Sequence, residues 1–458
     1  MQASKIAQQV IQLQTTFNLG LTRDLAWRVS QLIQLKSMLL DHQQDFLAAL
    51  KADLNKSEHE AWSTEIGFVI SDIEHTVKHL KSWSKARPVT TPLFLKPGKS
   101  YLLPEPLGCI LIIGAWNYPL QLVLAPLVAA IAAGNCAIIK PSELSPSTAE
   151  QLAQLIPQYL AQDAYLVVTG GVAETTELLQ QKFDHIFYTG GESVGKIVMR
   201  AAAEHLTPVT LELGGKCPCI VDNTANLPVS AARMVWSKWM NAGQTCVAPD
   251  YVIVEKSLLQ PLIQALKQKI VEFYASDASQ SADYGRIVNA AHFARLHRYL
   301  QNQDVIAGGN VDAKTKYIEP TIVLNPRSDS ALMQEEIFGP ILVILTVDNI
   351  QESIALINNK PKPLALYVYT KDRQFEQQVL SQTSAGSVAI NDGMIFMANP
   401  NLPFGGVGNS GLGVYHGQYG FDTFSHLKSV MKRSFWLDVA LRYPPFSALK
   451  LKLLKKLL

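Results

Sequence analysis

The chain has 458 residues, of which 48% are hydrophobic, and its 40 basic and 38 acidic residues leave a formal net charge of +2. This length predicts two or three domains with ample core, and the composition excludes an intrinsically disordered chain. Nucleic-acid-binding proteins usually carry a strong basic excess, so the near balance of charge gives no reason to expect a nucleic-acid partner.

Five cysteines are scattered among apolar neighbours. Their odd number and irregular spacing argue against a disulfide framework and favour a reducing cytoplasm. Cys217 and Cys219 are separated by one residue. Cysteine pairs that bind zinc are about two to four residues apart, so we expect no metal site.

Residues 1–20 lack the basic start and the unbroken apolar run of a signal peptide. The longest apolar stretch, 120–133, is interrupted by Gln121 and Pro126 and is too short to span a bilayer. We therefore expect a soluble protein.

The first part of the chain has the apolar periodicity of helices. One stripe consists of Leu25, Val29, Leu32, Ile33, Leu35 and Leu39, and a second lies within 66–80. The pair Arg87-Pro88 and the proline-rich run 92–106 then predict an extended segment that crosses to another part of the molecule.

Strands and helices alternate in the next part of the chain. The all-apolar run 109–114 predicts a buried parallel strand, and 120–133 predicts the helix that follows it. Further short strands are expected at 137–139, 165–168 and 185–188. This alternation predicts a doubly wound α/β domain whose ligand lies at the carboxyl ends of the strands.

The pattern restarts past Thr210 and predicts a second α/β domain from about 211 to about 391. Its expected strands are 219–221, 251–254 and 341–345, and its expected helices are 227–240 and 260–274. The stretch 400–413, which is rich in glycine and proline, should return to the first domain or to a partner subunit.

The motif NAGQTCVAP, residues 241–249, places Cys246 in a loop of small residues after a helix. Such a loop lets a substrate approach closely, and a thiolate is a good nucleophile. The alternative is a buried cysteine that only fills space. The polar neighbours Gln244 and Thr245 argue against an apolar burial site, which favours the nucleophile.

The motif TLELGG, residues 210–215, places Glu212 within an apolar stretch. Flanked by Leu211 and Leu213, the carboxylate should be desolvated, and its pKa should rise towards neutrality, which suits a general base. The alternative is a glutamate at a strand edge whose side chain points to solvent.

The motif GAWNYP, residues 114–119, follows the first predicted strand. Asn117 offers an amide N–H that could stabilise an oxyanion where the loop leaves the sheet. The alternative is an asparagine that bonds its own turn before Pro119.

Two further motifs follow predicted strands. TGGESVG, residues 189–195, puts glycines at a strand-to-helix turn, where backbone N–H groups and a helix N-terminus can meet a pyrophosphate. Its spacing departs from the usual GxGxxG. Lys140 and Glu143, in the turn KPSE, could hold ribose hydroxyls, and the alternative is a solvated turn.

In their order and spacing, these motifs resemble those of the aldehyde dehydrogenase superfamily over nearly the whole chain. The resemblance extends to EEIFGP at 335–340 and to LPFGGVGNSG at 402–411. The short N-terminus, NYP at 117–119, CVAPDY at 246–251 and GFDTFSH at 420–426 resemble the class 3 branch, which includes fatty and aromatic aldehyde dehydrogenases.

The resemblance implies an α/β aldehyde dehydrogenase fold with three parts. A Rossmann-like NAD(P)-binding domain would take residues 1–86 and 104–210, and an α/β catalytic domain would take 211–391. A small oligomerisation segment with the C-terminal tail would take 87–103 and 392–458. The class 3 resemblance also implies a homodimer that acts on small-molecule aldehydes.

The resemblance further implies a covalent mechanism. Cys246 would attack the aldehyde, and Asn117 with the backbone N–H of Cys246 would stabilise the oxyanion. After hydride transfer, Glu212 would activate the water that hydrolyses the thioester. The implied cofactor-binding residues are Lys140, Glu143, Gly190 and Gly195 for the adenosine and phosphates, and Glu336 with Phe338 for the nicotinamide ribose.

The implied cofactor is NAD, with NADP also accepted by many class 3 enzymes. A glutamate beside a ribose favours NAD, because a 2′-phosphate would meet a like charge. Two alternatives to the hydrolytic enzyme remain. An acylating dehydrogenase would pass the acyl group to coenzyme A without a water-activating base, and a binding or structural protein would need none of Cys246, Glu212 and Asn117.

Class 3 members often carry histidines in the segment that here reads GMIFMANP, residues 393–400. We therefore expect a more apolar or differently shaped substrate wall around Phe396. This favours medium-chain, long-chain or aromatic aldehydes.

The C-terminal tail predicts an amphipathic basic helix. Its apolar face would consist of Phe446, Leu449, Leu453, Leu454 and Leu457, with Lys450, Lys452, Lys455 and Lys456 mostly opposite. Such a helix can lie on an anionic membrane surface, which would make a cytoplasmic protein peripherally membrane-bound. The alternative is a tail that packs across a dimer interface.

Overall fold

The computed structural model describes residues 4–436, 438 and 440–457. Its first elements are α1 (Lys5–Asn18), α2 (Leu25–Asp41), α3 (Gln43–Leu54), α4 (Glu58–Ala61), the π-helical turn η2 (Trp62–Ile66) and α5 (Gly67–Trp83). The helices predicted for this part of the chain are confirmed. Ile33 is an exception to the predicted stripe on α2, because it is 49% exposed. It follows the buried Leu32 directly, and successive residues point about 100° apart around a helix.

A six-stranded sheet forms the centre of the first α/β layer, in the order β17-β7-β6-β3-β4-β5. Its strands are β3 (Cys109–Ile113), β4 (Cys136–Lys140), β5 (Tyr165–Val167), β6 (His185–Thr189), β7 (Val209–Glu212) and β17 (Gly411–Leu412). The helices between them are α6 (Gln121–Ala133), α7 (Pro146–Tyr159), α8 (Val172–Leu179) and α9 (Glu192–Ala203). The four strands predicted for the first domain are confirmed, and they run parallel.

The strand order reverses beside β3. The chain runs outward from β3 to β4 and β5 and then returns to β6 on the other side of β3. Ligands of open α/β sheets usually bind in the crevice at such a point. The loops after β3 and β6 carry the motifs GAWNYP and TGGESVG, so the topology brings these two motifs to the same crevice.

A seven-stranded sheet forms the second α/β layer, in the order β10-β13-β14-β9-β8-β15-β16. Its strands are β8 (Pro218–Val221), β9 (Tyr251–Glu255), β10 (Val305–Ala307), β13 (Thr321–Leu324), β14 (Ile341–Val347), β15 (Ala365–Tyr369) and β16 (Ser387–Ile390). Its longer helices are α10 (Leu227–Trp239), α11 (Leu259–Tyr274), α12 (Ala290–Tyr299), α14 (Ile350–Asn358) and α15 (Arg373–Gln382). The strands and helices predicted here are confirmed.

The glycine-rich stretch 400–413 returns to the first sheet, which was one of the two predicted options. Within it, Gly411 pairs with Glu212 and Leu412 pairs with Leu211 in antiparallel register. The chain therefore enters the second layer directly after Glu212 and later comes back beside the same residue.

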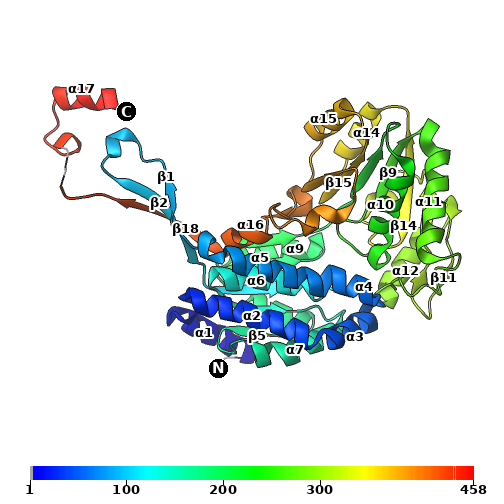
Figure 1. The fold of residues 1–458 in the computed structure, drawn as a ribbon, viewed down its shortest axis with the longest axis horizontal. Coiled ribbons are helices and arrows are strands. Elements are labelled where there is room, and N and C mark those ends of the chain that lie inside the picture. Colours follow the sequence, from blue (N-terminus) through cyan, green and yellow to red (C-terminus); the bar gives the residue numbers. More distant parts are fainter. Residues whose placement is uncertain (1–3, 437, 439, 458) are drawn as a thin grey trace.

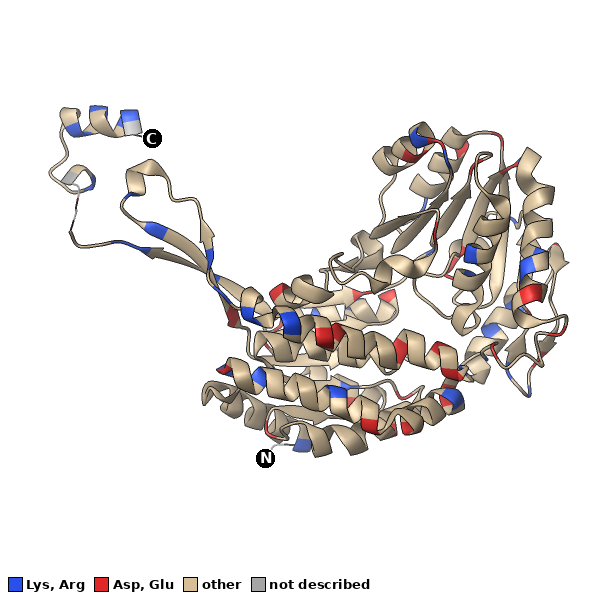
Figure 2. Cartoon of the chain, in the orientation of Figure 1, with Lys and Arg blue, Asp and Glu red and all other residues tan. Residues whose placement is uncertain are grey.

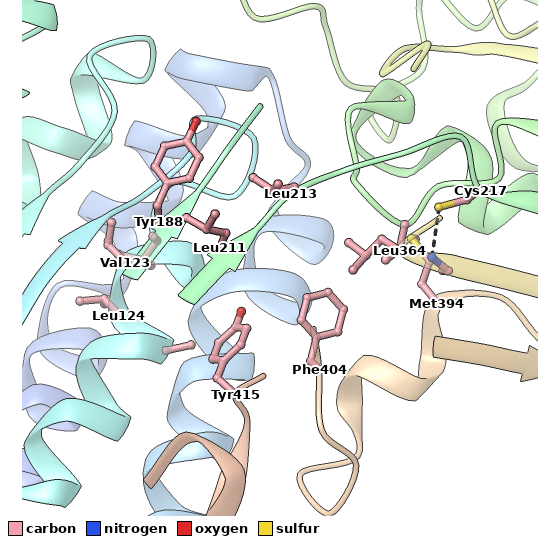
Figure 3. Packing of buried hydrophobic residues seen from close by; sticks show 14 of the residues in the cluster. Val123, Leu124, Tyr188, Leu211, Leu213, Cys217, Leu364, Met394, Phe404 and Tyr415 are labelled. Atoms are coloured by element: carbon pink, nitrogen blue, oxygen red, sulfur yellow. Dashed lines mark hydrogen bonds between the residues drawn. The ribbon is translucent and has the colours of Figure 1, made fainter. Parts of the chain in front are cut away.

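Helix α6 is buried along its whole length because it is apolar on all sides. It packs between the first sheet and the helices α2, α5 and α16 (Gly417–Thr423). Figure 3 shows Val123 and Leu124 of this helix near Tyr188 of β6 and Leu211 of β7. This packing makes the carboxyl edge of the first sheet a rigid support for the loops above it.

A three-stranded antiparallel sheet forms an arm that projects from the body of the molecule (Figure 1). It consists of β1 (Arg87–Val89), β2 (Lys99–Pro106) and β18 (Ser425–Lys432). The extended segment predicted at 92–106 is confirmed except for a 3-10 turn, η3 (Leu93–Leu95). The two parts of the arm are far apart in sequence, and β18 pairs with β2 along its full length.

The C-terminal tail lies beyond the arm and ends in helix α17 (Ala448–Leu457). The predicted amphipathic helix is confirmed, but Phe446 precedes it, and the side chain of Leu457 lies outside the described residues. Leu449, Leu453 and Leu454 are exposed. Figure 2 shows lysines along this helix and no acidic residue on it. Within the described parts of the chain, no helix is long and apolar enough to cross a membrane.

Candidate active site

Cys246 lies in the loop between α10 and β9. The loop turns through left-handed backbone at Asn241 and Ala242, with φ of 52° and 51°, and at Gly243, with φ of 74°. A Cβ atom at Gly243 would lie 2.2 Å from the carbonyl oxygen of Gly339, so this close approach requires glycine. The turn brings the cysteine back towards the first sheet.

The side chain of Gln244 fixes this loop. Its Nε2 donates to the carbonyl oxygens of Asn241 at 3.0 Å and of Arg286 at 2.9 Å. Its Oε1 accepts from the backbone N–H of Val288 at 3.0 Å. The side chain is buried with its polar atoms satisfied, which a glutamine needs when it is removed from water.

The polar neighbours of Cys246 lie in a buried but hydrogen-bonded environment. Gln244 and Thr245 are both buried, and Thr245 Oγ1 lies 2.7 Å from the hydroxyl oxygen of Tyr118. Cys246 itself is half-buried, whereas the other four cysteines are buried. Its exposure therefore comes from the cavities around it.

Burial raises the pKa of the Cys246 thiol well above its ordinary value, and the carboxylates of Glu336 and Glu212 raise it further. The backbone N–H groups of Cys246 and Val247 have the opposite, weaker effect because they favour the thiolate. The raised pKa favours the protonated thiol, which must lose its proton before it can act as a nucleophile.

Glu212 is the last residue of β7, and its side chain is buried. Neither carboxylate oxygen has a hydrogen-bond partner among the residues that the structure describes. Burial raises the pKa of this carboxyl group well above its ordinary value. The predicted desolvation is confirmed, and the alternative of a side chain that points to solvent is wrong.

Asn117 lies in the loop after β3 and is buried. Its side-chain Nδ2 donates to the backbone carbonyl oxygen of Gln244 at 3.0 Å. The backbone carbonyl oxygen of Asn117 accepts from Asn241 Nδ2 at 2.8 Å. The side-chain amide of Asn117 thus bonds to the loop that carries Cys246, here called the cysteine loop, and not to its own turn. One of its two amide N–H bonds is used in this way, and the other can serve a ligand.

Two cavities of different character meet at Cys246 and Glu212. Both residues line each of the two cavities. The first cavity is also lined by Trp116, Asn117, Gly190, Gly191, Gly214, His292, Arg295, Glu336 and Phe338. The second is also lined by Phe68, Tyr118, Leu122, Trp236, Met240, Met394, Ile395, Met397, Phe404 and Tyr415. One cavity therefore offers polar groups and glycines, and the other offers an apolar wall.

Three of the predicted cofactor-binding residues, Gly190, Glu336 and Phe338, line the first cavity. A Cβ atom at Gly214 would lie 2.2 Å from Oε2 of Glu336, so the first glycine of the TLELGG motif makes room for this carboxylate. Burial raises the pKa of Glu336 to about 8, and the nearby Asp250 adds to the increase.

The other three predicted cofactor-binding residues do not line that cavity within the described structure. Lys140 ends β4 and is buried, and its Nζ lies 3.5 Å from a carboxylate oxygen of Glu143, which is half-exposed. Gly195 lies in the first turns of α9, where a Cβ atom would be 2.9 Å from Leu213. This glycine therefore lets α9 pack closely on the segment after β7.

The sequence motifs missed two residues of the first cavity, His292 and Arg295. The ring of Trp116 meets that of Phe338 edge-on at 5.3 Å and that of His292 at 5.0 Å. Arg295 lies one helical turn after His292 on α12. No motif surrounds these two residues of α12, because they reach the site only through the packing of the second layer.

Among the described residues, no group of three or more metal-binding side chains is present.

The second cavity includes the segment where the sequence predicted an apolar wall. Met394, Ile395 and Met397 line it, in the 3-10 turn that follows β16. Phe396 is not among its lining residues, since its ring packs against Phe404. The apolar wall is thus built by the neighbours of Phe396.

The chain is similar to aldehyde dehydrogenases along most of its length. The model of the aldehyde dehydrogenase family matches residues 13–430. The chain is 49% identical over 444 residues to the rat (Rattus norvegicus) aldehyde dehydrogenase family 3 member A2, covering 96% of this chain and 92% of that protein. It is 47% identical over 444 residues to the dog (Canis lupus familiaris) dimeric NADP-preferring aldehyde dehydrogenase, covering 96% and 98%.

A bacterial relative is similar in both sequence and structure. The 4,4′-diaponeurosporen-aldehyde dehydrogenase of Staphylococcus aureus is 48% identical over 452 residues, covering 98% of each chain. The substrate-bound structure of Staphylococcus aureus AldH superposes with a TM-score of 0.97 at 47% identity, covering 99% of each chain. A Mycobacterium tuberculosis aldehyde dehydrogenase complexed with NAD⁺ superposes with a TM-score of 0.85 at 26% identity, covering 96% and 92%.

These comparisons confirm the resemblance, the α/β fold class and the NAD(P) cofactor expected from the sequence. They also confirm the class 3 branch, since family 3 and dimeric NADP-preferring enzymes are among the relatives. The chain is an oxidoreductase that oxidises aldehydes with NAD(P), and it belongs to the aldehyde dehydrogenase family.

Proposed function

We propose that the protein oxidises apolar aldehydes to carboxylic acids through a thioester on Cys246, which is hydrolysed by water that Glu212 activates. The observation that carries this proposal is the meeting of two cavities at these two residues, one of which offers charged side chains and glycines while the other has an apolar wall. A substrate in one cavity and a cofactor in the other would then reach the same sulfur from opposite sides.

The chain's own residues supply each step of the proposed reaction. The Cys246 thiol first releases its proton to solvent, and the resulting thiolate attacks the carbonyl carbon. The negative charge on the former carbonyl oxygen is stabilised by the Cys246 N–H and by the second amide N–H of Asn117. In hydrolysis, Glu212 takes a proton from water, the hydroxide attacks the thioester, and Cys246 leaves as a thiolate. A buried, unpartnered carboxylate with a raised pKa suits this base.

The first cavity fits a nicotinamide dinucleotide. Gly191 precedes α9 and has no atom within 4 Å of where its Cβ would lie, so a phosphate can approach the helix N-terminus. Glu336 and Phe338 would hold the nicotinamide ribose, and Lys140 with Glu143 would hold the adenosine ribose. When bound, the nicotinamide supplies the hydride acceptor. The tight packing of Gly195 supports a role in placing α9.

We expect Glu143 to select NAD over NADP. Its half-exposed carboxylate would meet a 2′-phosphate with like charge, so Glu143→Gln should raise the NADP/NAD ratio of kcat/KM by about tenfold. The exposed Glu150 on α7 offers the matched control, since Glu150→Gln removes a charge of the same domain. An unchanged ratio in Glu143→Gln would remove Glu143 from the cofactor site.

We propose medium-chain, long-chain or aromatic aldehydes as substrates. The apolar second cavity supports this class, and the Staphylococcus aureus relative is named for 4,4′-diaponeurosporen-aldehyde. Each buried methylene contributes about 0.8 kcal/mol, so kcat/KM should rise by about fourfold per added carbon until the cavity is filled.

A charge in the apolar wall should weaken this preference. Met397→Glu is expected to lower kcat/KM for decanal by at least about tenfold more than for butanal, because a carboxylate facing a buried alkyl chain must be desolvated. Met199→Glu, on the exposed face of α9, is the matched control. Equal losses for both aldehydes would mean that the alkyl chain does not lie along Met397.

The acylating alternative is tested by the product. With an aldehyde and NAD, the protein should form free carboxylic acid without coenzyme A, and mass spectrometry of the product in ¹⁸O-labelled water should show one incorporated oxygen. Turnover only with added coenzyme A would instead support the acylating enzyme. Absence of turnover under both conditions would support the non-catalytic alternative.

The domain division expected from the sequence is also part of the proposal. The NAD(P)-binding domain would take 1–86 and 104–210, the catalytic domain 211–391, and the oligomerisation segment and tail 87–103 and 392–458. The two separate, mostly parallel sheets and the projecting arm support it. The dimeric relative and the arm together support a homodimer, and five free cysteines support a cytoplasmic location.

We propose that the tail contacts anionic membranes. The exposed leucines of α17, its lysines and the exposed Trp436 before it support this contact. The full chain should float with phosphatidylglycerol vesicles and not with phosphatidylcholine vesicles, and deletion of residues 447–458 should abolish flotation. A deletion variant that floats equally well contradicts the proposal, and loss of the dimer would place the tail at the subunit interface.

A further inference from the structure

A buried ion pair lies beneath the loop that carries Asn117. Lys56 Nζ lies 2.5 Å from Oε1 of Glu65, and both side chains are fully buried. Lys56 lies in the turn after α3, and Glu65 lies in the π-helical turn η2. Such turns within helices occur frequently at functional sites. The sequence motifs contain neither residue.

Lys56 binds the first half of the Asn117 loop. Besides its ion pair, its Nζ donates to the carbonyl oxygen of Asn117 at 3.0 Å. The same nitrogen lies 3.9 Å from the centre of the Tyr118 ring, where a cation is attracted by the face of the ring. One buried ammonium group thus contacts two consecutive residues of the loop.

Glu65 binds the second half of the loop. Its Oε2 accepts from the backbone N–H of Leu120 at 2.9 Å and of Gln121 at 3.2 Å. These groups begin α6, whose first N–H groups have no partner within the helix. A carboxylate at a helix N-terminus is also favoured by the helix dipole. The pair therefore holds the loop from Asn117 to the start of the helix.

The loop held in this way is in turn bonded to the cysteine loop. The carbonyl oxygen of Asn117 that binds Lys56 also accepts from Asn241 Nδ2, and Asn117 Nδ2 donates to the carbonyl oxygen of Gln244. Asn241 Nδ2 contacts the same Gln244 oxygen at 3.1 Å. A shift of the Asn117 backbone would therefore change the place of its amide relative to Cys246.

We propose that Lys56 and Glu65 are positioning residues, which set the amide of Asn117 for the oxyanion formed on Cys246. Two charges removed from water cost free energy that an apolar pair of similar size would avoid, so the pair is not needed for packing alone. The proposal rests on the proposed role of Asn117 as an oxyanion donor. A donor that is displaced by a fraction of an ångström stabilises the transition state less.

The test is a double-mutant cycle with a neutral version of the pair. Lys56→Met with Glu65→Gln removes both charges and so leaves no unpaired buried charge. This variant should lower kcat/KM for aldehyde by about 10- to 100-fold at saturating NAD. In the Asn117→Ala background, the same two changes should lower it by less than about threefold, because the group that they position is gone.

Two controls separate positioning from general damage. Alkylation of Cys246 by iodoacetamide forms no oxyanion at a carbonyl, so its rate should be unchanged in the neutral pair. Asp53 is a buried carboxylate that accepts from the backbone N–H groups of Ser147 and Thr148 at the start of α7. Asp53→Asn should lower the melting temperature and leave kcat/KM within about twofold.

Each outcome decides the proposal. A large loss in the wild-type background that disappears in Asn117→Ala supports it. An equal loss in both backgrounds, or an equal loss in Asp53→Asn, overturns it and leaves the role of Asn117 intact. If Asn117→Ala alone retains its kcat/KM, the oxyanion role itself is wrong. If the neutral pair does not fold, Glu65→Gln alone, which keeps an acceptor oxygen for Leu120, is carried through the same cycle.

Discussion

Replacement of Cys246 by alanine is expected to lower kcat for aldehyde oxidation by at least about 10⁴-fold, because removal of a catalytic nucleophile eliminates the covalent path. No other cysteine can substitute for it, since the remaining four are buried. Binding of NAD should be retained, because the first cavity keeps its glycines and Glu336. Absorbance of the reduced nicotinamide, followed across a panel of aldehydes, measures the loss.

The buried Cys219 provides the control for this replacement. Its Sγ lies 3.5 Å from the sulfur of Met234, and Cys219 lines neither of the two cavities, so Cys219→Ala should lose some stability and keep its turnover. Wild-type turnover that persists in Cys246→Ala would contradict the thioester mechanism. Mass spectrometry of the wild-type protein quenched during turnover should show the acyl group on the peptide that contains Cys246.

Replacement of Glu212 by glutamine is expected to lower steady-state kcat by about 10²- to 10⁴-fold, because glutamine cannot take a proton from the hydrolytic water. The thioester should still form, so mixing with aldehyde and NAD should give a burst of about one reduced nicotinamide per active site. Rapid-mixing absorbance measures this burst. A variant without a burst, or with unchanged kcat, would contradict the role of Glu212.

The pH dependence follows from the raised pKa of Glu212. Burial favours the neutral acid, so the fraction of ionised base, and with it kcat, should rise as pH increases through the raised pKa. Glu60 provides the control, because burial also raises the pKa of its carboxyl group, to about 7. The part of the rise in kcat that Glu212 causes should be lost in Glu212→Gln, and it should be retained in the control variant Glu60→Gln.

The same shift predicts how stability changes. A raised pKa means that the folded state holds the proton of Glu212 more tightly than the unfolded state does, and this contribution is lost as pH rises through the folded pKa. A glutamine at position 212 does not titrate, so the variant does not lose stability in this way as pH rises. At pH 8, Glu212→Gln should therefore be at least as stable as the wild type in thermal unfolding.

The sequence determined the secondary structure and the chemical identity of the site. Apolar runs predicted the buried parallel strands, because a strand covered on both faces leaves no place for polar residues. The two leucines beside Glu212 correctly predicted its desolvation, since neighbours along a buried strand share its environment. Where periodicity alone was used, one residue of α2, Ile33, was assigned to the wrong face.

Only the tertiary structure decided what surrounds these residues. It divided the space at Cys246 into two cavities, brought Trp116 against Phe338, and placed Lys56 on the carbonyl oxygen of Asn117. The physical reason is that local patterns record which face of an element is buried, and they do not record which distant element covers it. Contacts between residues far apart in sequence depend on how whole sheets and helices pack, and no single motif contains that information.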